Sequence, residues 1–229
     1  MGNPLHFSAE LPQRCLQLID ELWPYVEKTR QAEGSDLGPL TTTFLISMSM
    51  PIINLPIERI ERHKNAQIEG YADDRSIDPK VAKTVLDTLG GQRLSNAPFY
   101  LPGQWSFAIY AKNPLFNIAN SIPDDLATEL GSKQAAAKAS KMPVLQWCSI
   151  LRNAMAHGGI AFLNESGRTS YGEPVKMYAF VSGTFDDTDQ RELLHLNVLR
   201  ISETNYRKFL SRWVTWLKSS GLASELAAA

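Results

Sequence analysis

Residues 151–159, LRNAMAHGG, mark the point at which the chain changes its periodicity. Apolar residues recur at helical spacing over residues 142–157, and after residue 159 they recur at strand spacing. Gly158 and Gly159 follow His157 directly, and glycine is typical of the position where a helix ends. The stretch therefore predicts a helix that ends at polar side chains and is followed by strands.

A helical projection of this segment, at about 100° per residue, separates an apolar face from a polar one. The apolar face consists of Val144, Trp147, Cys148, Leu151 and Met155. Asn153 and His157 fall on the polar side one turn apart, together with Gln146 and Ser149. Arg152 lies at the border, about 140° from His157, and has to reach around the helix to join it.

The residue types at this helix end suit the cleavage of RNA. A histidine in the last turn of a helix is stabilised as a cation by the helix dipole, and histidine transfers protons near neutral pH. An arginine guanidinium is well suited to contact a phosphate. Because the 2′-hydroxyl of RNA attacks the adjacent phosphate, this reaction needs neither a protein nucleophile nor a metal. The spacing alone is equally compatible with an exposed helix end that has no chemical role.

The sequence RNAMAH from Arg152 to His157, followed by Gly158, resembles the signature of the HEPN superfamily. In that signature an arginine, usually followed by a polar residue, precedes a histidine with four to six residues between them. The helices before the motif and the amphipathic terminal helix also resemble that superfamily, and the pattern after the motif resembles its plasmid and defence-locus subgroup. The resemblance implies a mainly α fold, a HEPN-like helical bundle with a small antiparallel β-sheet inserted between the motif helix and the C-terminal helix.

The resemblance also implies a function. Such proteins are commonly metal-independent endoribonucleases, often toxins or antiphage, abortive-infection effectors, and they act as homodimers in which two motifs face each other. Carried onto this chain, His157 transfers protons, Arg152 contacts the phosphate and Asn153 orients them, while a second histidine comes from the partner subunit. The resemblance implies no cofactor and no metal, with RNA as substrate and an antitoxin protein as a further partner.

Two alternatives to an enzyme stay open, because a shared fold does not fix an activity. The first is a non-catalytic module that binds nucleotide, RNA or a protein partner through the same helix end. The second is an antitoxin-like partner of another protein.

Composition places further bounds on the function. A chain of 229 residues with a net charge of -1 predicts a single domain without a global basic field, so RNA contacts have to come from local patches. Lys133, Lys138 and Lys141 form one such patch shortly before the motif helix, in a segment that is either a solvated helix or a mobile loop. The two cysteines lack the spacing of a metal site and indicate buried thiols. With no membrane-spanning stretch, we expect a cytoplasmic protein.

The first 91 residues are expected to form helices. The first helix, over residues 8–33, should kink at Pro24. Its apolar stripe at helical spacing consists of Leu11, Cys15, Leu18, Ile19, Leu22, Tyr25 and Val26. A buried helix over residues 40–50 should be interrupted by Pro51 and Pro56. The remaining helices of this part are expected over residues 57–65 and 78–90.

The second part of the chain is expected to be mixed. Residues 92–141 are predicted to be an irregular connection with one short helix over residues 123–130. A β insertion over residues 160–201 is predicted to contain strands at 160–163, 175–181 and 193–201. A last amphipathic helix should occupy residues 202–220. His195, within the last strand, is interpreted as a structural residue.

Overall fold

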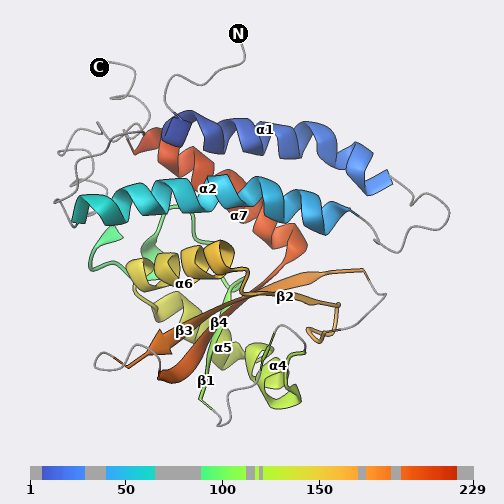
Figure 1. Cartoon of the computed structure of the whole chain (residues 1–229), viewed down its shortest axis with the longest axis vertical. Helices are drawn as coiled ribbons and strands as arrows, with labels where there is room; N and C mark the ends of the chain where they lie inside the picture. The colour runs from blue at the N-terminus through green and yellow to red at the C-terminus, as the bar shows by residue number, and fades with distance from the viewer. Residues whose placement is uncertain are drawn as a thin grey trace. The chain divides into compact units, whose positions relative to one another are not determined.

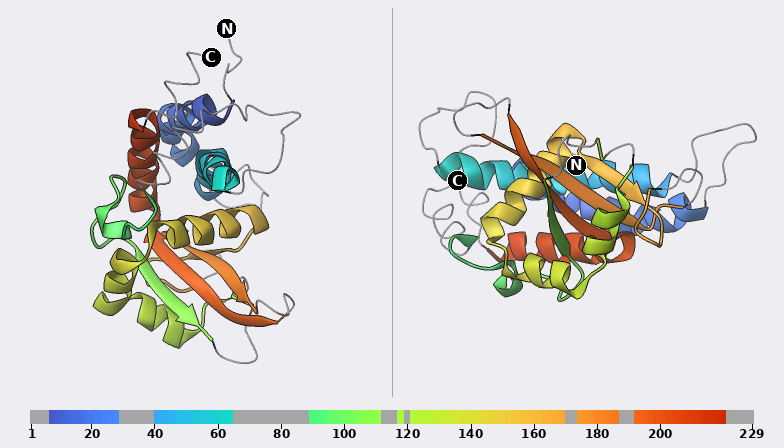
Figure 2. Two further views of the ribbon diagram at one scale, coloured as in Figure 1. Left: turned by 90° about the vertical axis from the view of Figure 1, so that its left-hand side faces the viewer. Right: turned by 90° about the horizontal axis from the view of Figure 1, so that it is seen from below.

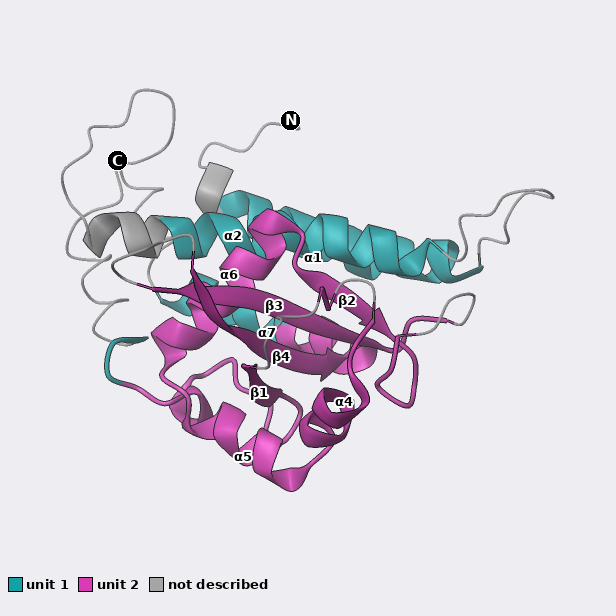
Figure 3. Cartoon of the chain, turned by 60° about the horizontal axis from the view of Figure 1, so that its bottom comes forward, with its two compact units in different colours: residues 1–91, 210–229 teal, residues 92–209 magenta. Residues whose placement is uncertain are grey.

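The computed structural model describes residues 7–28, 40–64, 89–111, 117–118, 121–169, 174–186 and 192–220. The fold is mixed α/β with a helical majority and one four-stranded antiparallel sheet (Figure 1). The chain divides into two compact units (Figure 3). Unit 1 comprises residues 1–91 and 210–229, and unit 2 comprises residues 92–209. None of the described helices combines the length and apolar character needed to cross a membrane.

Unit 1 contains α1 (Phe7–Lys28), α2 (Thr41–Lys64) and the second half of α7 (Glu203–Ser219). Helices α1 and α2 pack against each other. The described core of this unit is large and apolar, which is what stabilises helices in folded proteins. It includes Ile19 and Trp23 of α1, Leu45, Ile52, Ile53 and Ile57 of α2, and Trp213 and Val214 of α7.

The expected break in α2 is wrong, because the helix runs without interruption through Pro51 and Pro56. Each proline removes one backbone hydrogen bond. Buried apolar side chains on both sides of these prolines outweigh that loss, and Trp213 replaces one of the missing donors through a bond from its indole Nε1 to the carbonyl oxygen of Ile52. Helix α1 likewise includes Pro24 within its bounds. The helix expected over residues 78–90 falls almost wholly outside the described residues.

The sheet belongs to unit 2 and has the order β1-β4-β3-β2. Its strands are β1 (Ser106–Tyr110), β2 (Ile160–Leu163), β3 (Met177–Phe185) and β4 (Leu193–Ser202). The three strands predicted after residue 159 are present, but β3 covers residues 177–185 instead of 175–181. Strand β1 corrects the prediction that residues 92–141 are an irregular connection and that the whole sheet follows the motif helix. Strand β1 pairs with β4, and Ser106 lies opposite Arg200. Because this pairing joins residues far apart in the chain, the sequence around β1 gives little indication of a strand.

The described part of that segment also contains short helices. A short 3-10 helix, η1, spans Leu94–Asn96, α4 spans Asp124–Leu130 and α5 spans Lys133–Lys141. Ser132 caps α5 by accepting a hydrogen bond from the backbone N–H of Ala135 at 3.1 Å, and Ala135 and Ala139 are buried. The segment that the sequence left open between a helix and a loop is therefore a helix.

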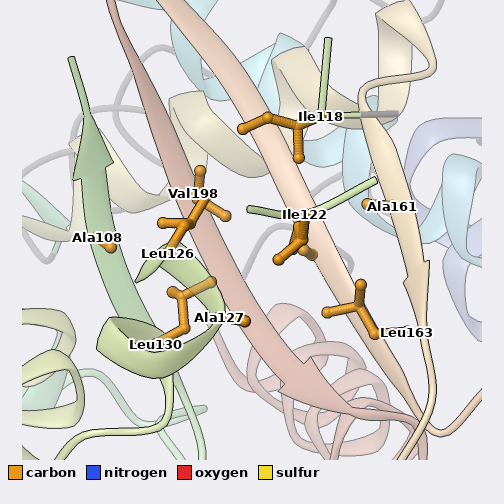
Figure 4. Close-up of a cluster of buried hydrophobic side chains, with 10 residues drawn as sticks. Ala108, Ile118, Ile122, Leu126, Ala127, Leu130, Ala161, Leu163 and Val198 are labelled. Carbon is orange, nitrogen blue, oxygen red and sulfur yellow. The ribbon is translucent and has the colours of Figure 1, made fainter. Parts of the chain in front are cut away.

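Helices cover both faces of the sheet. Helices α4 and α5 lie on one face, and α6 (Val144–His157) lies on the other (Figures 1 and 2). The α4 side is filled by a cluster of buried aliphatic side chains, among them Leu126, Leu163 and Val198 (Figure 4). The α6 side is filled by aromatic rings, since Trp147 of α6 packs against Trp105, which in turn contacts Phe180 of β3. Burial on both faces fixes which side chains of each strand point toward α6.

Candidate functional site

The candidate site is built on α6, and both ends of this helix are tied to the rest of unit 2. At its start, the backbone N–H of Val144 donates to Gln92 O at 3.0 Å, and that of Leu94 donates to Met142 O at 2.8 Å. These bonds join the beginning of α6 to the segment that contains η1. The helix is therefore held in place before its polar residues begin.

At its other end, α6 terminates as predicted at His157, and two glycines serve two different needs. Gly158 has φ 69°, a left-handed conformation that glycine adopts without strain, and its N–H donates to Ala154 O. Gly159 has no room for a Cβ atom, because the carbonyl oxygen of Val181 occupies that space. The N–H of Val181 donates to Gly159 O at 2.7 Å. The end of α6 is thus fixed against β3.

The predicted polar face exists in the structure. Helix α6 is regular from Val144 to His157, so Asn153 and His157 lie one turn apart on one side. His157 is exposed and Asn153 is half-buried. The opposite face is buried, and it consists of Val144, Trp147, Cys148, Ile150, Leu151, Ala154 and Met155. The candidate proton-transfer residue is therefore accessible on a helix that packing holds rigid.

Arg152 occupies a different part of the helix surface. Helical geometry places it about 140° from His157, its side chain is half-buried, and its Nε atom is buried. Burial of the stem of an arginine is common and leaves the charged end to act at some distance from the Cα atom. The structure thus unites Asn153 and His157 on one face and sets Arg152 on the flank.

The three lysines are not part of this cluster. Lys133, Lys138 and Lys141 are exposed on α5, which covers the other face of the sheet from α6 (Figure 2). Lys138 Nζ forms an ion pair with Glu129 at 2.7 Å. Lys141 precedes α6, so the whole helix, about 20 Å long, separates it from His157.

A polar row on the sheet was not predicted from the sequence. Ser182 lies opposite Asn197, and Thr184 lies opposite His195, on adjacent strands β3 and β4. Ser182 and Thr184 lie two and four residues after Phe180 on β3, and their β4 partners face the same way, so all four side chains face the same side of the sheet as α6. Ser182 and Asn197 are buried, and Asn197 Nδ2 donates to Thr184 Oγ1 at 2.8 Å. The signal available in the sequence was the recurrence of polar residues at every second position of two apolar strands.

The thiols and the acidic groups do not form a further centre in the described part of the chain. Cys15 and Cys148 are buried thiols, and burial raises the pKa of the Cys15 thiol. No three His, Cys, Asp or Glu side chains among the described residues gather in a way that could hold a metal ion.

Comparison of this chain with protein-family models, with curated proteins and with solved structures gives no match.

Proposed function

We propose that this chain is a HEPN-like endoribonuclease that cleaves RNA without a metal ion and acts as a homodimer. The observation that carries the proposal is the exposure of His157 at an anchored helix end, with Asn153 one turn before it. Anchoring matters, because a catalytic side chain contributes most when its position is fixed before the substrate binds.

The reaction uses a nucleophile that RNA itself supplies. The 2′-oxygen attacks the adjacent phosphorus as a base removes its proton, a bond from the 2′-oxygen to phosphorus forms, and the bond to the 5′-oxygen breaks. An acid gives a proton to the leaving 5′-oxygen, so the products carry a 2′,3′-cyclic phosphate and a 5′-hydroxyl. The imidazole of His157 is suited to one of these proton transfers. The other falls to the same histidine of a second copy, which is why the proposal includes a dimer.

Arg152 and Asn153 stabilise the reacting groups in this proposal. The guanidinium of Arg152 contacts the phosphate, where negative charge increases as the bond to the 5′-oxygen breaks. Because Arg152 starts on the flank of α6, it needs the full length of its side chain to do so. The amide of Asn153 orients the imidazole or the phosphate from the same face of the helix.

Product chemistry tests the reaction directly. Purified protein is incubated with a labelled RNA oligonucleotide in EDTA, and the termini are identified by mass spectrometry. We expect 2′,3′-cyclic phosphate and 5′-hydroxyl ends, and we expect no cleavage where the scissile nucleotide carries a 2′-O-methyl group. Ends with a 5′-phosphate and a 3′-hydroxyl, or cleavage of the 2′-O-methyl substrate, would contradict the proposal.

The flank position of Arg152 favours one alternative, a non-catalytic module that binds nucleotide, RNA or a protein through the same helix end. An arginine on a different side of the helix from the histidine is better suited to binding a ligand than to contacting the same phosphate at which the histidine transfers a proton. Binding of RNA by the wild-type protein with no turnover over a broad pH range would select this alternative.

A toxin or antiphage role is the cellular form of the proposal. Induced expression of the wild-type protein should then arrest growth, whereas the His157→Ala protein at equal abundance should not. Growth arrest by both proteins would show that the toxicity does not result from RNA cleavage by His157. An antitoxin partner would be identified by its ability to relieve the arrest caused by the wild type.

A further inference from the structure

The apolar stripe of α1 is divided into a buried half and an exposed half. Within unit 1, Cys15, Ile19 and Trp23 are only 1–6% exposed. Three other apolar residues of the stripe are exposed, with exposed fractions of 42% for Leu18, 41% for Leu22 and 72% for Tyr25. Their spacing of four and three residues places them in one row along the helix. A row of large exposed apolar side chains on one helix is a typical protein-binding surface.

Charged residues beside this row alternate in sign along the helix. Glu10, Arg14, Glu21 and Lys28 all project from the same side of the row in a helical projection. In the first half of α1 a negative residue is followed by a positive one, and the same order recurs in the second half. Arg14 Nε and Glu10 Oε2 are 3.9 Å apart, and both side chains remain partly exposed.

This pattern is complementary to itself when two copies of α1 run antiparallel. A two-fold axis near Leu18 places Arg14 of one copy beside Glu21 of the other, and Glu10 beside Lys28, because the midpoints of both pairs lie within about one residue of Leu18. The axis also keeps the charged flanks on the same side of the pair, so both matches occur twice. A parallel two-fold pair would place the two charged flanks on opposite sides, so none of these pairs could form.

We infer that the Leu18, Leu22 and Tyr25 face of α1 binds a second copy of this chain in antiparallel orientation, with the two-fold axis near Leu18. Leucine and tyrosine side chains form the dry centre of this interface, and the four charged residues form its rim. The interface lies in unit 1, whereas α6 lies in unit 2. It is therefore separate from the α6 pairing in the proposed function and does not depend on ribonuclease activity.

Cysteine cross-linking tests both the surface and its register. Under mild oxidation Leu18→Cys should form a disulfide-linked dimer rapidly, because the axis brings its two copies together. Leu22→Cys should react far more slowly, since its copies lie about 12 Å apart along the helix axes. The native thiols are buried, and the wild type serves as the background control. Equal rates for the two variants, or no cross-link with Leu18→Cys, would overturn the inference.

Analytical ultracentrifugation with charge swaps provides a second test. Arg14→Glu and Glu21→Arg should each weaken dimerisation by roughly tenfold, because each swap breaks two symmetry-related pairs. The double swap should restore it. Leu22→Glu should abolish this association, whereas Gln13→Glu, exposed on another side of α1, should not. A dimer that survives Leu22→Glu unchanged would overturn the inference and would point instead to association elsewhere, such as through α6.

Discussion

The indole Nε1 of Trp213 donates a buried hydrogen bond of 2.9 Å to the carbonyl oxygen of Ile52. In an uninterrupted helix that oxygen would accept a bond from the backbone N–H of residue 56, but residue 56 is a proline. Trp213 in α7 therefore supplies the donor that the sequence of α2 lacks. This explains in part why α2 continues through Pro56, and it ties two segments of unit 1 that are far apart in the chain.

Replacement of Trp213 by phenylalanine should lower the free energy of unfolding by about 1–3 kcal/mol, because the Ile52 carbonyl loses its partner in a buried place. A double-mutant cycle with Pro56→Ala isolates this bond, since alanine restores the backbone donor. Chemical denaturation should show that Trp213→Phe costs less in the Pro56→Ala background than in the wild type. Strict additivity of the two substitutions would show that the indole bond does not compensate for the proline.

The two glycines after His157 should respond differently to alanine. Gly158→Ala introduces strain of about 1–2 kcal/mol from its positive φ, but its Cβ atom meets nothing within 4 Å. Gly159→Ala forces the backbone of β3 to move away from the Cβ atom and should cost more. Urea denaturation compares the two. A larger loss of stability in Gly158→Ala would contradict the close approach of Val181.

The buried thiol of Cys15 predicts a pH dependence of stability. Burial raises its pKa above the ordinary value of 9.0, so the folded protein keeps the thiol neutral when the unfolded chain ionises it. The contribution is complete below pH 9.0 and is lost as the pH rises from there toward the folded-state pKa. The unfolding free energy, measured between about pH 8 and pH 10, should fall more steeply for the wild type than for Cys15→Ala. Parallel curves would mean that Cys15 ionises equally in both states.

The lysines of α5 are expected to leave the chemical step unchanged. Substitution of Lys133, Lys138 and Lys141 by glutamine removes charges that lie on the opposite face of the sheet from α6. The single-turnover rate at saturating RNA should stay within about twofold of wild type, whereas any effect should appear in affinity and in its salt dependence. A large loss of the saturated rate would place the lysines closer to the reaction than α5 allows.

Local patterns were sufficient to predict much of unit 2. The end of α6 at His157, the three strands after it and the bounds of α7 follow from glycine positions and from changes of periodicity. Strand β1 could not be found in this way, because its five residues are stabilised by pairing with β4 rather than by their own propensity. The continuity of α2 also depends on a distant residue, Trp213.

The same distinction holds for the candidate site. A helical projection was enough to place Asn153 and His157 on one face, since α6 is regular. The burial of Arg152 depends on neighbours in space, and so does the orientation of Ser182 and Asn197 toward α6. Strand register decides that orientation, and a shift by one residue would turn the whole polar row away.

The central claim is that His157 transfers protons in RNA cleavage, and single-turnover cleavage by purified His157→Ala tests it most directly. Gln146→Ala, exposed on the polar side of α6 but about 16 Å nearer its start, is the matched control, and circular dichroism verifies the fold of both variants. The account predicts a loss of at least about a hundredfold for His157→Ala, a comparable loss for Arg152→Lys, and near wild-type cleavage by Gln146→Ala. Undiminished cleavage by folded His157→Ala would contradict the account.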